Sequence, residues 1–363
     1  MIQRRKTRQI RVGDVKIGGD APVSIQSMAK TDTRDVAATV KQIKGLEAAG
    51  CDIVRVAILD SRAARAIKAI KKKIKIPLVA DIHFQYKLAI EAINAGADKI
   101  RLNPGNIKDR AGIEQVVKLA KKRKIPIRIG INSGSVLYNP SPSPLPIGER
   151  VRVRGMVKAA LDYIKLFEGM DFYDIIISLK ASSVATTIDA YREMAELCDY
   201  PFHLGVTAAG PSERGIVKSS VGIGALLAEG IGDTIRVSLT GDPCEEVRVA
   251  KEILSALNLR RGGIDIISCP TCGRCEVNLV KVVREFENQL LRRGTVHRAP
   301  TKVAIMGCVV NGPGEAKEAD IGIAAGKNCG IFFKKGKIVR KIKESDFVKV
   351  LLDEMDSIIN PNS

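Results

Sequence analysis

The 363-residue sequence contains no tryptophan, and aromatic residues make up only 4% of it. Proteins that bind single-stranded nucleic acid usually stack bases on such rings, so this sequence disfavours that class of function. No run of eighteen apolar residues is present, and residues 1–6 (MIQRRK) lead into no apolar signal core. We therefore expect a cytoplasmic protein without a membrane segment, in a compartment where cysteines serve as ligands or packing residues rather than as disulfides.

Acidic residues are scarce relative to basic ones, because 40 Asp and Glu stand against 59 Lys and Arg, for a formal net charge of +19. A lysine-rich surface accounts for part of such an excess. An anionic substrate, an acidic protein partner or nucleic acid would also account for it. Only the placement of the cations along the chain separates these possibilities.

The first 260 residues repeat one pattern of short apolar strand, loop and amphipathic helix. A hairpin is predicted around Gly13 and Asp14, followed by strands at 21–28, 52–58, 78–84, 99–104, 127–133, 174–181, 202–208 and 234–240. Several of the helices between them end at glycines, as at Gly50, Gly96 and Gly230, where a left-handed cap suits glycine. Eight β–α units over this length predict an α/β fold of the (β/α)8 TIM-barrel type rather than an open doubly wound sheet.

The repeated pattern of strand, loop and helix ends at residues 260–263, which predicts a domain boundary, with domains at 1–260 and 261–363. After a cysteine-rich turn we expect a helix at 277–292, strands at 302–306 and 321–325, a hairpin of 330–333 with 337–342, and a helix at 345–359. This pattern predicts a small α+β domain that could carry a metal centre.

Arginine and lysine interrupt the apolar strands of the predicted barrel. The helix-covered outer face of a strand would leave such a cation unpaired, so we expect these side chains to point inward. Side chains two residues apart on a strand point to the same face, so several polar residues share the faces of these cations. The inward set is Arg55, Arg101 with Asn103, Arg128 with Asn132, Lys180, and Arg236 with Ser238. Two explanations stay open: an internal lattice of ion pairs with Asp81 and other acids, or a site for a polyanion such as a diphosphate.

Four cysteines fall in two short runs, Cys269, Cys272 and Cys275 in SCPTCGRC and Cys308 in MGCVVNGPGE. Three nearby thiols with a remote fourth ligand favour an iron–sulfur cubane. A zinc knuckle remains open from the spacing alone, as does a site without metal. The other four cysteines are expected to be buried as small apolar residues.

The same two runs closely resemble the family of 4-hydroxy-3-methylbut-2-enyl diphosphate synthases of the methylerythritol phosphate route to isoprenoids. Further motifs of that family lie at 81–84 (DIHF), 101–106 (RLNPGN), 128–135 (RIGINSGS), 218–224 (KSSVGIG) and 233–239 (DTIRVSL), so the resemblance covers nearly the whole chain. It implies an oxidoreductase of the cytoplasm that opens and dehydrates 2-C-methyl-D-erythritol 2,4-cyclodiphosphate with two electrons.

The resemblance also implies the parts of the site. A [4Fe–4S] cluster would be held by Cys269, Cys272, Cys308 and Glu315, of which Glu315 can yield its iron to the substrate. The inward cations and Ser238 would anchor the diphosphate. Electrons would come from reduced ferredoxin or flavodoxin, and two chains would pair as a homodimer in which the small domain of one caps the barrel of the other. Neither a nucleic acid nor a membrane partner is expected.

Two departures from the family pattern concern Cys275, an additional thiol, and Ala208, which stands where the family has an acid–base glutamate. We expect Cys275 not to be a ligand of the cluster, that is, to be a bystander. Either the substitution at Ala208 makes the chain an acid–base-impaired variant, or another group or a water takes the proton-transfer step. His83, Asp81 and His203 are the candidate groups, which we expect near the barrel mouth. Outside the family, the alternatives are a barrel enzyme acting on a sugar phosphate with structural zinc, or a basic nucleic-acid-binding protein with a zinc knuckle.

Overall fold

A computed structural model of the chain describes residues 2–103, 106–107, 109–135, 149–260, 264–293, 301–308, 314 and 316–359. The chain divides into two compact units, Met1–Arg260 and Arg261–Ser363.

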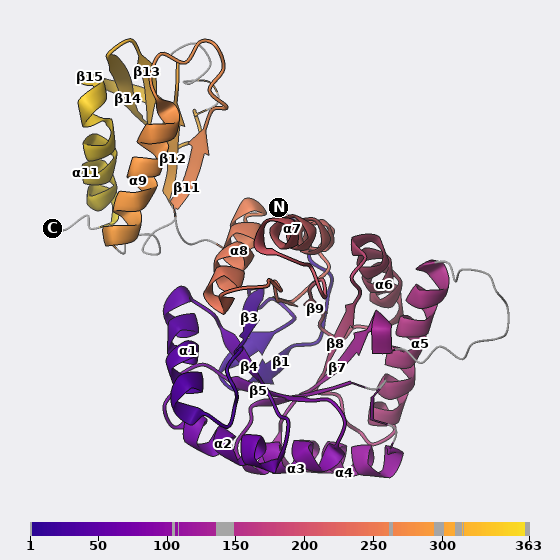
Figure 1. Ribbon diagram of the computed structural model, residues 1–363. Helices are drawn as coiled ribbons and strands as arrows, with labels where there is room; N and C mark the ends of the chain where they lie inside the picture. The colour runs from indigo at the N-terminus through magenta and orange to yellow at the C-terminus, as the bar shows by residue number, and fades with distance from the viewer. Residues whose placement is uncertain are drawn as a thin grey trace. The chain divides into compact units, whose positions relative to one another are not determined.

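The first unit is a barrel of eight parallel strands surrounded by helices (Figure 1). The strand order is β8-β7-β6-β5-β4-β3-β10-β9. A bridge between Ile177 and Phe202 joins β8 to the chain just before β9 and closes the ring. The strands are β3 (Ser24–Met28), β4 (Ile53–Ala57), β5 (Leu78–Ile82), β6 (Lys99–Leu102), β7 (Ile127–Asn132), β8 (Ile175–Lys180), β9 (His203–Leu204) and β10 (Thr234–Ile235). The predicted (β/α)8 fold is confirmed.

The helices of this unit begin and end where the sequence provides caps. Asp35 accepts a hydrogen bond from the Ala38 amide at the start of α1, and Gly50 ends this helix at φ 88°. Gly96 and Gly230 also adopt the left-handed conformation predicted for them. The helices are α1 (Val36–Ala49), α2 (Ser61–Lys71), α3 (Tyr86–Asn94), α4 (Arg110–Arg123), α5 (Glu149–Glu168), α6 (Val184–Leu197), α7 (Ser212–Ala228) and α8 (Pro243–Ala256).

The N-terminal hairpin is confirmed as β1 (Ile10–Val12) and β2 (Val15–Ile17), paired in antiparallel register. Its apolar residues pack against Ile53, Val79 and Ile176, which point inward from β4, β5 and β8. This apolar cluster fills the end of the barrel at which the strands begin. The polar interior described below therefore belongs to the other end.

Two predicted strands were too long. The segments 202–208 and 234–240 form only the short strands β9 and β10, whose ladder stops near Gly205. A β-carbon at Gly205 would lie 2.5 Å from the Lys180 Nζ and 2.5 Å from the Arg236 carbonyl oxygen. Beyond this point the chain passes around inward-pointing side chains instead of continuing regular pairing.

The second unit is a five-stranded mixed sheet in the order β11-β12-β13-β14-β15. The helices α9 (Leu279–Arg293) and α11 (Phe347–Ile359) pack together over one of its faces (Figure 1). The strands are β11 (Ile264–Ser268), β12 (Thr301–Met306), β13 (Ile321–Gly326), β14 (Cys329–Lys334) and β15 (Lys337–Lys343). The predicted α+β pattern is correct, but β11 was missed and the cysteine-rich turn follows this strand.

Candidate active site

A cavity of about 220 Å³ opens where the strands of the barrel end. This is the end at which (β/α)8 barrels carry their functional groups. It is lined by Met28, Arg55, Asp81, His83, Arg101, Arg128, Asn132, Ser178, Lys180, Thr207, Arg236 and Ser238. The structure thus brings together every predicted barrel site residue except Asn103, which is buried at the end of β6 but does not line the cavity. Met28, Ser178 and Thr207 were not predicted.

Strand periodicity explains why these side chains share one cavity. On β7 the inward positions Arg128 and Asn132 alternate with Ile129 and Ile131, which belong to the apolar core beneath the helices. Gly130 lies between the two inward residues, and a β-carbon there would stand 2.5 Å from the Arg101 Nε. Only glycine leaves room for that guanidinium to cross the strand.

Asp81 is the central acid of the cavity. Its carboxylate lies 3.1 Å from Arg101 Nη1, 3.5 Å from Arg55 Nε and 3.2 Å from His83 Nε2. Burial alone would raise the pKa of Asp81, but Arg55, His83 and Arg101 outweigh this effect and hold it well below its ordinary value of 3.8. Asp81 is therefore ionised at neutral pH and is a poor proton donor.

The cations of the interior outnumber its acids. Six are buried or nearly so, namely Arg55, Lys99, Arg101, Arg128, Lys180 and Arg236. Among the described residues, the acids that pair with members of this set are Asp81 and Glu246, the latter 3.9 Å from Arg236 Nε. Burial, reinforced by the neighbouring arginines, lowers the pKa values of Lys99, Arg128 and Lys180 well below their ordinary range. An internal ion-pair lattice therefore does not balance this cluster.

Several of these cations also keep hydrogen-bonding capacity that the described protein atoms do not use. Arg128 Nε and Nη1 and Arg101 Nε are buried without a protein partner. Arg55 directs Nε and Nη2 at the Met28 sulfur, at 3.2 and 2.9 Å, and a thioether is only a weak acceptor. Donors and charge of this kind suit a multiply charged oxyanion.

The three candidates for an acid–base group lie in different surroundings. His83 is at the rim, with 43% of its side chain exposed. His203 does not line the cavity: it is fully buried beside Thr234, and burial together with Lys180 and Arg128 lowers its pKa well below 6.5. The expectation that His203 lies near the mouth was therefore wrong. Ala208 follows Thr207 directly and has φ 50°, a conformation rare for a residue other than glycine.

In the second unit, the two cysteine runs follow adjacent parallel strands. Ser268 of β11 is in register with Ile305 of β12, so the loops carrying Cys269 and Cys308 leave the same edge of the sheet. The Gly307 amide donates to the Cys269 sulfur at 3.3 Å. A β-carbon at Gly307 would lie 3.3 Å from the Cys269 sulfur and 2.4 Å from that of Cys275, so only glycine leaves this space open.

The donor set fits a thiolate-bound metal centre in its chemistry, because thiolates are ligands for iron–sulfur clusters and zinc. No disulfide joins any of the eight cysteines, all of which lie in the described residues. Cys272 is exposed, in a turn closed by the hydrogen bond from the Cys275 amide to the Cys272 carbonyl. Within the described parts of the chain, no three Cys, His, Asp or Glu side chains converge as metal ligands. Glu315, the fourth ligand that the family resemblance implies, lies outside the described residues.

The class of this protein is a (β/α)8 barrel with a cation-lined cavity at its strand ends, followed by a small α+β unit with thiols on adjacent loops. The chain belongs to the GcpE family. Residues 7–251 match the GcpE TIM-barrel domain, and residues 265–357 match the GcpE protein C-terminal domain. The resemblance inferred from the motifs is thereby confirmed.

Curated relatives agree over the full length. A protein of Ruminiclostridium cellulolyticum is 57% identical over 98% of this chain and 99% of its own, and one of Clostridium perfringens is 54% identical over 98% and 100%. Both are named 4-hydroxy-3-methylbut-2-en-1-yl diphosphate synthase (flavodoxin). These matches give no support to the zinc-dependent alternatives.

Among solved structures, a dihydropteroate synthase of Coxiella burnetii covers 69% of this chain and 99% of its own, with a TM-score of 0.50 and 14% identity. This likeness concerns the barrel fold alone. In the described residues, no helix has the length and apolar character needed to span a bilayer.

Proposed function

We propose that this chain converts 2-C-methyl-D-erythritol 2,4-cyclodiphosphate to 4-hydroxy-3-methylbut-2-enyl diphosphate. The C–O bond to the ring phosphate breaks, a hydroxyl leaves as water, and two electrons and two protons are consumed. The observation that carries the proposal is the excess of buried cations around one cavity at the ends of the barrel strands. A cyclic diphosphate supplies the missing negative charge, and the family match supports this substrate.

In this proposal the arginines and Lys180 bind and orient the diphosphate. Arg101 and Arg128 are the most buried of these arginines, Arg236 and Ser238 would contact the diphosphate from the segment that includes and follows β10, and Asn132 stands at the end of β7. Asp81 stays ionised and orients His83, whose Nε2 lies 3.2 Å away. His83 is then the better of the two as proton donor, because it is half-exposed at the rim.

The reductive step requires a redox group that no side chain of the cavity provides. We assign a [4Fe–4S] cluster to Cys269, Cys272, Cys308 and Glu315; when bound, it would pass the two electrons of the reaction from the reduced donor to the substrate. Thiolates on adjacent loops and the space at Gly307 support the assignment. The names of the relatives support flavodoxin as the electron donor, with ferredoxin as the alternative.

The proposal is tested with anaerobically reconstituted protein, the cyclic diphosphate and reduced flavodoxin or ferredoxin. We expect brown protein with about four irons per chain, and product detected by mass spectrometry. Colourless protein that binds one zinc and forms no product would refute the function. A cytoplasmic location, tested by cell fractionation, belongs to the same proposal.

We also propose a homodimer in which the cysteine unit of one chain serves the barrel of the other, because the required groups lie on separate units. Mixing Arg128→Met with Cys269→Ser protein tests this directly. Random heterodimers of a shared site should recover about a quarter of wild-type activity. If each chain uses its own cysteine unit, every site carries a defect and no activity returns.

A further inference from the structure

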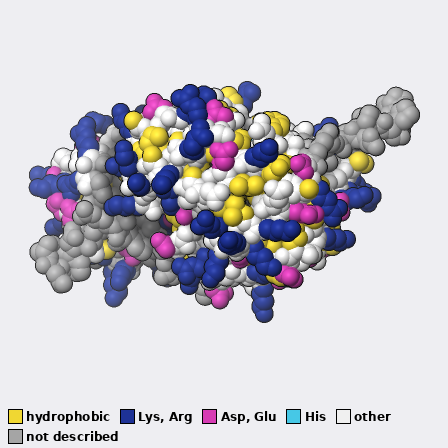
Figure 2. Space-filling view, turned by 90° about the horizontal axis from the view of Figure 1, so that it is seen from below, with side chains coloured by type: hydrophobic (Ala, Val, Ile, Leu, Met, Phe, Trp, Pro, Cys, Tyr) yellow, Lys and Arg dark blue, Asp and Glu magenta, His cyan; other side chains and the backbone are white. Residues whose placement is uncertain are grey.

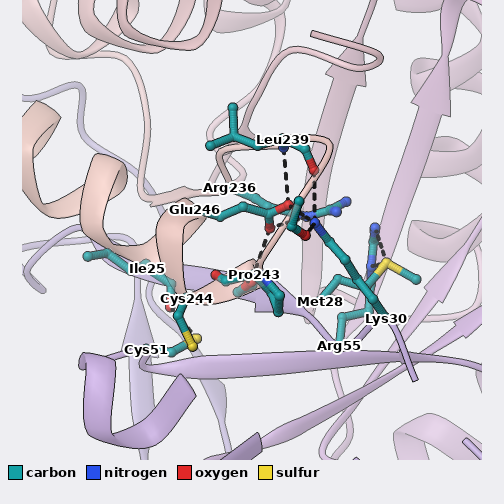
Figure 3. A network of polar contacts seen from close by, with 12 residues as sticks. Ile25, Met28, Lys30, Cys51, Arg55, Arg236, Leu239, Pro243, Cys244 and Glu246 are labelled. Carbon is teal, nitrogen blue, oxygen red and sulfur yellow. Dashed lines mark hydrogen bonds and ion pairs between the residues drawn. The ribbon is translucent and has the colours of Figure 1, made fainter. Parts of the chain in front are cut away.

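Glu246 is a buried carboxylate that touches the substrate cavity only through other residues. It lies in the first turn of α8, and 1% of its side chain is exposed. Oε2 accepts a hydrogen bond from Ser27 Oγ at 3.1 Å, and Oε1 accepts one from the Leu239 amide at 3.1 Å (Figure 3). One carboxylate thus joins β3, α8 and the segment that follows β10.

Lys30 completes this arrangement from the opposite side. Its Nζ lies 3.1 Å from Glu246 Oε1 and donates to the carbonyl oxygens of Leu239, at 2.8 Å, and Gly241, at 2.5 Å (Figure 3). The Leu239 peptide is therefore bound through both its amide and its carbonyl. Ser238, which lines the cavity, is the residue immediately before this fixed point.

Glu246 also reaches the second cavity residue of this segment. Its Oε2 lies 3.9 Å from Arg236 Nε, which has no hydrogen-bond partner among the described protein atoms. Burial lowers the pKa of Arg236, and Glu246 is the first of the acids that oppose this shift. The carboxylate thus supports the charge of Arg236 from outside the cavity lining.

The start of α8 does not require this buried charge. Asp242 already caps the helix by accepting from the Cys244 amide, and Pro243 occupies the first turn. Burying a carboxylate costs several kcal/mol by order of magnitude unless it is paired. Glu246 contacts Arg236 directly and the Leu239 amide, next to Ser238, by a hydrogen bond. A role in holding these two cavity residues therefore explains why a carboxylate is buried here.

We infer that Glu246 is a positioning residue that holds Arg236 and Ser238 in place for the diphosphate. The inference rests on the proposed function of the cavity and adds to it a residue outside the cavity lining. A residue that acts only through its charge would behave differently. Removing a negative charge beside an anion site should tighten anion binding, whereas loss of positioning should weaken it.

Two substitutions separate these roles. Glu246→Gln removes the charge, and Glu246→Asp keeps the charge but withdraws it by one methylene. We expect both to weaken binding of inorganic pyrophosphate roughly tenfold, and to raise KM for the cyclic diphosphate more than they lower kcat. Tighter binding by Glu246→Gln with unchanged binding by Glu246→Asp would overturn the inference. Glu245→Gln is the matched control, because Glu245 pairs with Arg248 at the surface.

Ser27→Ala provides a test that does not depend on the folding of the Glu246 variants. It removes one neutral donor to Oε2, and we expect pyrophosphate binding to weaken about threefold with little change in Tm. Unchanged affinity in Ser27→Ala and Glu246→Asp would count against positioning. Absence of pyrophosphate binding to the wild-type protein would instead refute the proposed function of the cavity itself.

Discussion

The cation cavity of the barrel and the cysteine loops of the second unit differ in how their side chains are held. The cavity residues stand on or directly after strands of a closed, hydrogen-bonded sheet. The cysteines lie in loops after β11 and β12, and in the described residues no three potential metal ligands converge. On the face shown in Figure 2, lysine and arginine side chains are spread over the surface with acidic side chains among them.

This difference indicates what fixes the side chains of each site. The barrel fixes its cations before any ligand arrives, and their mutual repulsion is a cost that the fold carries. Thiolate ligands generally reach their final arrangement when metal binds, because metal binding and local folding are coupled. The two sites should therefore fail independently, and the following experiments test that separation.

Removal of one thiolate should have the largest effect. We expect Cys308→Ser to lose the bound iron and all reductive activity, because Cys308 is one of only three thiolates in the proposed ligand set. Iron content and visible absorbance measure the first effect, and pyrophosphate affinity measures the state of the barrel. Full iron content in the variant would refute the ligand assignment, and lost pyrophosphate binding would refute the independence of the sites.

The reverse experiment is Arg128→Met. Arg128 is 1% exposed, and two of its nitrogen atoms have no hydrogen-bond partner among the described residues. We expect pyrophosphate affinity to fall about 100-fold. The free energy of unfolding should rise by about 1–3 kcal/mol because an unpaired buried charge is replaced by a side chain of similar volume.

Isothermal titration calorimetry and chemical denaturation measure the two consequences of Arg128→Met, and iron content should not change. A variant that is both less stable and unimpaired in binding would show that Arg128 is a structural ion-pair partner. Lys158→Met, on α5, is a control for the loss of one positive charge outside the cavity.

Ala208→Glu tests whether the cavity lacks an acid–base group. Ala208 follows the cavity residue Thr207 and already has φ 50°, so a longer L-residue adds no new backbone strain. We expect turnover to rise about tenfold, which is below the usual contribution of a well-placed general acid. Steady-state kinetics of cluster-loaded protein decide the question, with Ala208→Gln as the control. Unchanged or lower kcat would show that another group, such as His83, already performs this step.

The inward direction of the arginines could be predicted from the sequence. Side chains alternate between the two faces of a strand, and helices cover the outer face of the barrel, so a guanidinium on a strand must point inward. Lys99 was missed although it shares the inward face with Arg101, because a lysine at the start of a strand resembles a flanking residue. Glu246 could not be found in this way, since a glutamate in an amphipathic helix is normally exposed and its burial depends on Ser27 and Leu239. Likewise, no spacing rule gives the positions of Cys269 and Cys275 around Gly307.

Lys99 allows the cost of the cation cluster to be measured as a function of pH. It is fully buried and donates to Gln26 Oε1 at 3.2 Å, and burial followed by Arg128 and Arg55 lowers its pKa well below 10.5. Between that lowered value and 10.5, unfolding takes up a proton, so Lys99 makes the folded state more stable as pH rises.

Lys99→Met should therefore remove part of this pH dependence. We expect a gain of about 1 kcal/mol near neutral pH, even though Gln26 loses its donor, and a smaller gain as the pH approaches about 10. Urea denaturation of both proteins at several pH values measures the difference. A constant difference at all pH values would mean that Lys99 keeps its proton in the folded protein.

The smallest effect is expected for Cys275→Ser. The Cys275 thiol donates to the Val277 carbonyl oxygen at 3.2 Å and lies beside Gly307, contacts that a serine hydroxyl largely reproduces. If Cys275 is a bystander, iron content and turnover should match the wild type, whereas Cys272→Ser should lose iron. A loss of iron in Cys275→Ser with full iron in Cys272→Ser would exchange the two residues in the ligand set. The cysteine loops would then bind the cluster through the thiol that already lies with Cys269 beside Gly307.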